Sequence, residues 1–79
     1  MNWHNTLNII YSKLEAHGYP AISKEIHEAQ LSGGTGGEIF DLVISRLVSI
    51  KKNKPDVYAI IKSEIDSLIE YGINIGYLK

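Results

Sequence analysis

Apolar residues recur every three or four positions through most of this chain, which is the spacing of one face of an α-helix. The first such stripe consists of Trp3, Leu7, Ile10 and Leu14. Gly18 and Pro20 follow it, and a left-handed glycine and a proline are both common just past a helix C-terminus. We therefore predict a first helix over residues 3–17.

A second, shorter stripe follows immediately. Proline is tolerated in the first turn of a helix because its missing amide proton has no partner there. The stripe consists of Ile22, Ile26 and Ala29. We predict a second helix over residues 20–31.

The segment from Ser32 to Glu38 contains four glycines within five positions, which breaks the helix. Thr35 and Glu38 have the spacing of a capping box. In that motif the threonine hydroxyl accepts a hydrogen bond from the amide of Glu38, and the glutamate carboxylate reaches back to the amide of Thr35. We therefore expect a tight interhelical turn, or a close approach of two backbones, that ends by starting a third helix.

The third helix, predicted over residues 36–51, has apolar residues around more than half of its circumference. Such a helix either lies centrally in a core or offers one face to another protein. A fourth helix begins near Pro55, and its stripe is formed by Tyr58, Ile61, Ile65 and Leu68. We expect Gly72 to end this helix near Tyr71. The apolar tail over residues 73–79 is expected to pack back on the helices as a short extended segment.

These patterns predict an all-α fold: a compact bundle of about four short helices, with a glycine-rich turn between the second and the third. The 79 residues form one domain, residues 1–79, because this length supports a single thin core. The absence of cysteine excludes disulfides and thiolate metal sites.

Charge and hydropathy narrow the classes of function. Eight basic and nine acidic residues give a net charge of −1, which lacks the basic footprint of a nucleic-acid-binding protein. No apolar stretch approaches the roughly 20 residues of a membrane span. Residues 1–5 contain no basic segment followed by an apolar run, as a signal peptide would. We expect a cytoplasmic protein that does not bind membranes.

No segment of the chain has the residues of a catalytic or cofactor site. The glycine-rich segment lacks the lysine and the preceding strand of a phosphate-binding loop, and Glu38 would repel an anion there. His27-Glu28 could start a zinc-binding helix only with a second histidine at position 31, which is Leu31. No nucleophile and base can be paired by spacing. We therefore expect no enzymatic activity, no cofactor and no metal.

Aromatic side chains are numerous for so small a bundle, and tyrosine is favoured in protein interfaces. We predict a partner-binding surface that combines tyrosines with acidic neighbours, the latter forming a negative strip on the fourth helix. The candidate residues are Tyr11, Tyr19, Tyr58, Tyr71, Asp56, Glu64, Asp66 and Glu70.

The stretch from Leu31 to Ile39, running into an apolar helix, resembles a turn found in small bacterial all-helical proteins. Those proteins carry a Ser-Gly-Ser/Thr-Thr-Gly-x-Glu-Ile-like turn between two helices, and some are immunity proteins that neutralise a toxin. The match covers about 20 of the 79 residues, and Gly34 stands where a hydroxyl residue is usual. The resemblance implies a helical fold and a protein partner, such as a cognate toxin.

Our leading hypothesis is a small protein-binding module that sterically occludes its partner. In its more specific form, this hypothesis makes the chain an immunity protein. One alternative is a structural homodimer that completes its core across the apolar third helix. Another is a nucleic-acid adaptor that uses Lys51, Lys52 and Lys54. The apolar character of the third helix argues against that last alternative, because a recognition helix presents polar side chains to base edges.

Overall fold

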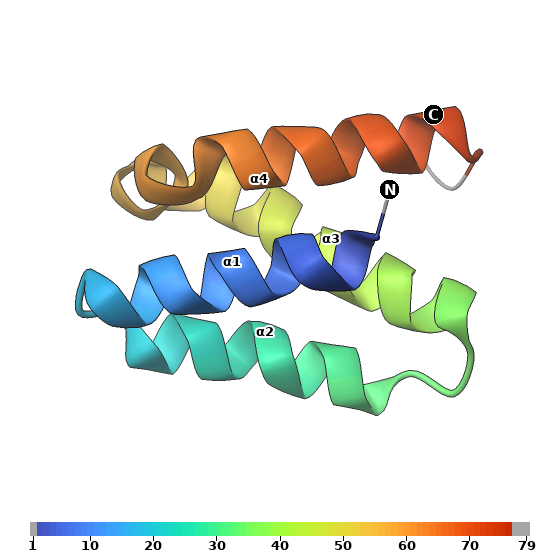
Figure 1. Ribbon diagram of the computed structural model, residues 1–79, viewed down its shortest axis with the longest axis horizontal. Helices are drawn as coiled ribbons and strands as arrows, with labels where there is room; N and C mark the ends of the chain where they lie inside the picture. The colour runs from blue at the N-terminus through green and yellow to red at the C-terminus, as the bar shows by residue number, and fades with distance from the viewer. Residues whose placement is uncertain (1, 77–79) are drawn as a thin grey trace.

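The computed structural model describes residues 2–76, and this part of the chain forms four α-helices and no strand (Figure 1). The helices are α1 (Trp3–Ala16), α2 (Pro20–Ser32), α3 (Gly36–Asn53) and α4 (Pro55–Asn74). Successive helices run in opposite directions, as their short connections require. The predicted all-α bundle and the glycine-rich turn between the second and third helices are confirmed.

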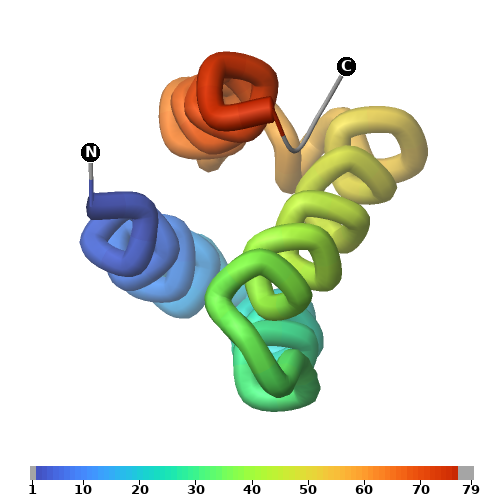
Figure 2. The backbone as a smooth tube through the Cα atoms, turned by 90° about the vertical axis from the view of Figure 1, so that its right-hand side faces the viewer, coloured from blue at the N-terminus to red at the C-terminus, as the bar shows by residue number. Residues whose placement is uncertain are grey.

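The four helices surround one core (Figure 2). Each helix packs on its chain neighbours, and α1 also packs on α4, which closes the ring. The backbones of the diagonal pairs stay apart, and apolar side chains fill the space between them. The buried core consists of Leu7, Ile10, Leu14, Ile26, Phe40, Val43, Ile44, Leu47, Ile50, Val57, Ile61, Ile65 and Leu68.

The first two helices begin and end close to the predicted positions. The side chain of Asn2 caps α1 by accepting a hydrogen bond from the amide of His4 at 3.1 Å. Gly18 has a φ of 85°, the left-handed conformation expected after a helix, and the amide of Tyr19 then donates to the carbonyl of Leu14 at 2.8 Å. Pro20 lies in the first turn of α2 as predicted.

The connection between α2 and α3 depends on one glycine and one capping box. The hydroxyl of Thr35 accepts a hydrogen bond from the amide of Glu38 at 3.2 Å, as predicted. The carboxylate of Glu38 reaches one residue further back than expected and accepts from the amide of Gly34 at 3.1 Å. A Cβ atom on Gly33 would lie 2.5 Å from Cγ1 of Ile39 and 2.7 Å from its backbone nitrogen. Two backbones therefore approach closely here, which explains the glycine at position 33.

The predicted end of the fourth helix is wrong. Gly72 lies inside α4 and is buried, and the helix continues to Asn74. Glycine in a helix costs about 1 kcal/mol relative to alanine, which tertiary packing can offset. The left-handed glycine that follows the helix is Gly76, with a φ of 85°.

The expected packing of the tail is also wrong for the part that the structure describes. Ile73 is helical, and Ile73 and Ile75 are 51% and 45% exposed. The rest of the predicted tail, residues 77–79, lies outside the described residues. The apolar pattern therefore predicted the wrong environment for these two side chains. The pattern does not distinguish an apolar residue that packs on the core from one at a helix end that projects beyond it.

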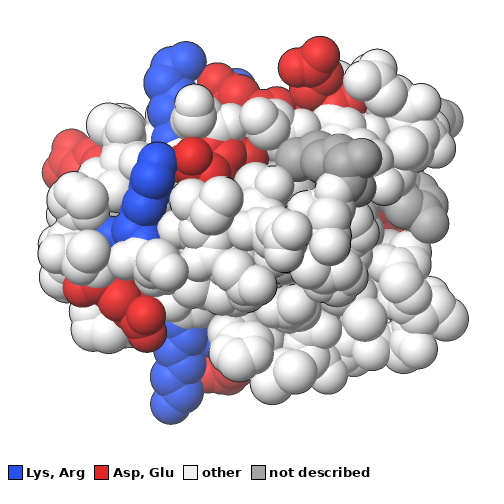
Figure 3. Space-filling model, viewed as in Figure 1, with Lys and Arg blue, Asp and Glu red and all other residues white. Residues whose placement is uncertain are grey.

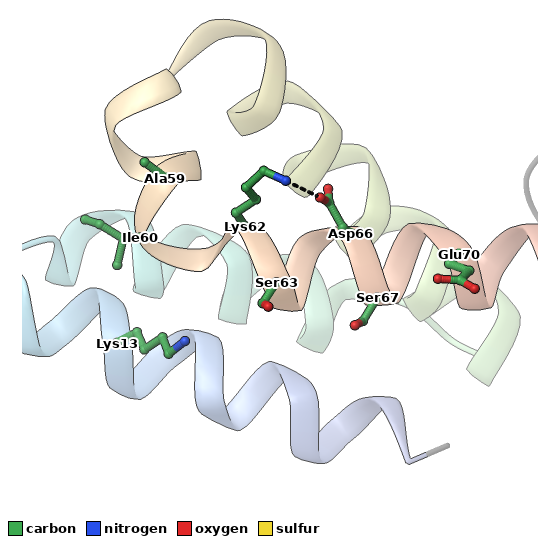
Figure 4. Close-up of a pocket in the computed structure, with 8 residues that line it drawn as sticks. All are labelled: Lys13, Ala59, Ile60, Lys62, Ser63, Asp66, Ser67 and Glu70. Atoms are coloured by element: carbon green, nitrogen blue, oxygen red, sulfur yellow. Dashed lines mark hydrogen bonds and ion pairs between the residues drawn. The ribbon is translucent and has the colours of Figure 1, made fainter.

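Helix α4 is kinked at Ile61, whose φ of −119° and ψ of 23° are not helical. The side chain of Ile61 is fully buried, so the core holds the kink in place. The first six residues of α4 consequently point in a different direction from the rest of the helix (Figure 4). The kink bends the outer face of α4 at the point where α4 passes α1.

Candidate functional site

The outer face of α4 carries two adjoining hollows. The larger has a volume of about 470 Å³ and the smaller about 270 Å³. The larger is lined by Lys13, Ala59, Ile60, Lys62, Ser63, Asp66, Ser67 and Glu70 (Figure 4). The smaller is lined by Ser67, Glu70, Tyr71 and Asn74. Because the hollows share Ser67 and Glu70, we treat them as one groove, the α4 groove.

An ion pair between α1 and α4 fixes one wall of the groove. The ammonium group of Lys13 lies 3.0 Å from both carboxylate oxygens of Glu64. The side chain of Glu64 is only 13% exposed, so this carboxylate is largely removed from solvent and needs its partner. The charge of Glu64 is therefore already compensated within the molecule.

A second set of contacts lies at the kink. The hydroxyl of Tyr58 donates to Oδ1 of Asp66 at 2.6 Å. Residues eight apart are separated by about 12 Å along a straight helix, so the kink is what brings these two together. The ammonium groups of Lys62 and Lys51 lie 3.2 Å and 3.5 Å from the same carboxylate.

These contacts set the charge state at the kink. The hydrogen bond from Tyr58 lowers the pKa of Asp66, and Lys62 and Lys51 lower it further, against a smaller opposing effect of burial. The hydrogen bond to Asp66 in turn raises the pKa of Lys62. Both ammonium groups also lie within 6.0 Å of the Tyr58 ring centroid, a favourable cation–π arrangement. Asp66 is thus ionised at neutral pH and neutralised by its neighbours.

The structure brings five of the eight predicted partner-binding residues to the α4 groove or its walls. Asp66, Glu70 and Tyr71 line the groove, and Tyr58 and Glu64 hold its walls. Two carboxylates of the predicted negative strip, Glu64 and Asp66, are in ion pairs with lysines, which reduces the negative charge that the strip presents. Among the described residues, Glu70 is the one carboxylate of the groove lining that has no ion pair.

The other three candidates lie elsewhere. Asp56 is exposed in the first turn of α4. Tyr11 faces α2, where its hydroxyl donates to Oε1 of Gln30 at 2.7 Å, and burial raises its pKa to about 12. Tyr19 is half-buried at the start of α2. The structure therefore divides the predicted surface into separate regions.

Sequence reasoning missed several residues of the groove. Ser63, Ser67 and Asn74 join Glu70 at spacings of four, three and four, which makes a polar stripe along α4. That periodicity was present in the sequence and could have identified the stripe. Lys13 could not have been found in this way, because 51 positions separate it from Glu64.

Charge is unevenly distributed along the bundle. In Figure 3, Lys and Arg lie toward one end of the visible face, and the opposite side shows none. Within residues 2–76, the half of the bundle next to the glycine-rich turn contains no Lys or Arg. Its carboxylates are Glu28, Glu38, Asp41 and Glu70, together with Asp66, which lies just past the middle of α4 and pairs with Lys51 and Lys62 from the other half. The free end of the α4 groove, beside Glu70, therefore lies in the acidic half.

Exposed apolar side chains are spread over all four helices and do not concentrate at the groove. They are Ile9, Leu31, Leu42, Ile73 and Ile75. Over residues 2–76, no helix combines the length and the apolar character needed to cross a membrane. The same residues contain no group of three or more histidines and carboxylates placed to hold a metal ion.

Similarity to known proteins adds nothing to this geometry. No protein-family model matches the chain, and no curated protein or solved structure matches it.

Proposed function

We propose that this chain is a small protein-binding module and that the α4 groove is its docking surface. The observation that carries the proposal is the groove itself, a trough along α4 whose walls are held by the Lys13–Glu64 and Tyr58–Asp66 contacts. Small-molecule sites are mostly apolar and enclose their ligand. This groove is open and lined mainly by polar side chains, which suits a segment of another protein.

Preorganised walls favour binding. A side chain that must be ordered on association costs about 0.5–1.5 kcal/mol, so groups already fixed in the free protein reduce that cost. Lys13 and Asp66 are fixed by ion pairs before any partner arrives. Two further lining residues, Ser63 and Ser67, have short side chains with little conformational entropy to lose.

The sharper form of the proposal is an immunity protein, whose partner is a toxin that it covers sterically. The resemblance of the glycine-rich turn to the turns of such proteins supports this form. The contacts of Gly33, Thr35 and Glu38 are all internal to the turn, so its role is to join α2 and α3. Recognition then falls to another surface, which we assign to the α4 groove.

The two alternatives receive less support. The apolar face of α3 is largely used by the core: five of its residues are buried, although Leu42 is 41% exposed. That leaves little apolar surface for a dimer interface on this helix. Of the three lysines considered for nucleic acid, Lys51 is paired with Asp66.

The test is site-specific photocrosslinking in the native host. A benzoylphenylalanine at Ser67, in the groove, is compared with one at Ser45, which is exposed on α3. We expect position 67 alone to crosslink one foreign protein, and that protein to be toxic when expressed without this chain. Crosslinking of the chain to itself, or equal yields from both positions, would contradict the proposal.

A further inference from the structure

We propose that the α4 groove recognises an arginine side chain in the partner and that Glu70 is its anchor. This inference rests on the proposed protein-binding function and specifies the chemistry of the partner. It is carried by charge complementarity in the groove and by the acceptors that surround one carboxylate.

Most charged side chains of the groove are already in ion pairs. Lys13 is paired with Glu64, and Lys62 is paired with Asp66. Glu70 is exposed, lines both hollows, and has no ion pair in the described part of the chain. An occupant of the groove therefore meets one carboxylate without an ion pair, at the junction of the two hollows.

Hydrogen-bond acceptors surround the carboxylate of Glu70. Ser67 and Asn74 lie three residues before and four residues after Glu70, so all three occupy one face of α4 and line the same hollow. A guanidinium group has five donors in a planar fork, which a carboxylate and two neighbouring oxygens can accept together. An ammonium group is a compact point charge that gains less from such a set. The ring of Tyr71 adds an aromatic surface on which a guanidinium can stack.

The charges that surround Glu70 also favour a cation. The half of the bundle that contains Glu70 has no Lys or Arg within residues 2–76. Lys51 and Lys62 share the carboxylate of Asp66, which leaves one net positive charge at the kink. Lys62 precedes Glu70 by eight positions, about 12 Å along a helix, so this charge lies away from the smaller hollow, whose one charged lining residue among those described is Glu70. The larger hollow, whose lining includes Ser63 and Ser67, is left for the residues that flank the arginine.

The experiment is an NMR titration of the full chain with the peptide acetyl-Gly-Ser-Arg-Ser-Gly-amide. Its comparison peptide carries citrulline, which has nearly the same shape as arginine and no charge. We expect saturable shifts of the backbone amides of Ser67, Glu70, Tyr71 and Asn74 with the arginine peptide alone. Glu70→Gln should weaken binding about tenfold, the effect of losing one charge-assisted contact. The control Asp41→Asn, an exposed carboxylate on α3, should leave the affinity unchanged.

Several results would overturn the inference. The inference fails if the amide shifts spread evenly over all exposed carboxylates, or if no saturable shift appears at millimolar peptide. It also fails if the citrulline peptide or a lysine peptide binds as tightly as the arginine peptide, or if E70Q binds the arginine peptide with unchanged affinity. The amide spectrum of E70Q shows whether the variant is folded. If a partner crosslinked from position 67 binds E70Q as well as the original chain, the arginine assignment fails and the docking function stands. If the arginine peptide binds through Glu70 but no protein crosslinks, the docking function fails instead.

Discussion

Replacing Gly33 by alanine tests the claim that the α2–α3 connection is limited by space rather than by backbone conformation. Gly33 has a φ of −80° and a ψ of 147°, which alanine adopts without strain. The added Cβ would nevertheless lie 2.5 Å from Cγ1, 2.7 Å from N and 2.8 Å from Cα of Ile39. The side-chain atom can rotate away, but the backbone atoms belong to the first turn of α3. The amide of Ile39 also donates to the carbonyl of Thr35 at 2.9 Å, which holds that turn in place.

The size of the effect follows from these distances. Carbon atoms prefer separations of about 3.5–4.0 Å, so the connection must move by roughly 0.7 Å or more. Overpacking of this kind typically costs about 1–3 kcal/mol. Alanine also reduces the entropy of the unfolded chain, which returns about 0.4–1 kcal/mol. We expect a net loss of roughly 1–2 kcal/mol, a large part of the stability of a domain of this size.

The measurement is urea unfolding followed by circular dichroism and by the fluorescence of Trp3, which packs edge-on against Phe40 in the core. The matched control is Gly36→Ala, because an added Cβ at Gly36 meets nothing within 4 Å and its φ is not positive. Gly36 is the first residue of α3, so alanine there should be neutral or stabilising by up to about 1 kcal/mol. If Gly33→Ala is as stable as the original chain, or if Gly36→Ala costs as much, the steric explanation is wrong.

Three further perturbations, the last with a matched control, have defined outcomes. Tyr58→Phe removes the main cause of the lowered pKa of Asp66. A carboxyl group whose pKa is lower in the folded than in the unfolded protein stabilises the fold above the unfolded pKa. This stabilisation is lost as the pH falls through the folded pKa. The variant should therefore lose stability at neutral pH and little in strong acid, as urea unfolding at both pH values can show. Burial raises the pKa of Tyr11 from 10.0 to about 12. The stabilisation of the fold by the neutral phenol is therefore complete below pH 10 and is lost as the pH rises through 12. An ultraviolet titration should show a tyrosine ionisation step near pH 12, and Tyr11→Phe should remove that step. Leu47→Ala empties a fully buried position and should cost about 2–5 kcal/mol in thermal unfolding. Leu31→Ala, at a side chain that is 72% exposed, should change the free energy of unfolding by less than about 0.5 kcal/mol.

Local chemistry made much of the fold predictable. Gly18, Thr35 and Pro55 each act on their own neighbourhood, so the helix boundaries near them could be read from the sequence. Gly72 misled the prediction because its helical conformation depends on packing that the sequence does not display. The kink at Ile61 could not be predicted, because no proline lies near it in the sequence after Pro55.

The candidate site was less predictable for the same reason. Side-chain type drew attention to α4, and the structure places Tyr58, Asp66 and Glu70 together at the groove or its walls. The sequence could not reveal that Asp66 is neutralised while Glu70 is left without an ion pair. That difference depends on the kink and on contacts with α1 and α3, which are set only by the tertiary structure. Whether these residues bind a partner stays a prediction.

The closed ring of helices has a consequence for the order of folding. Contacts between successive helices join segments that are close along the chain, and such contacts form quickly in helical proteins. The pairing of α1 with α4 is different, because Lys13 and Glu64 are 51 positions apart and closing that loop has the greatest entropic cost. We expect this pairing to be completed after the main folding barrier. Weakening it should then speed the opening of the bundle and leave its rate of formation nearly unchanged.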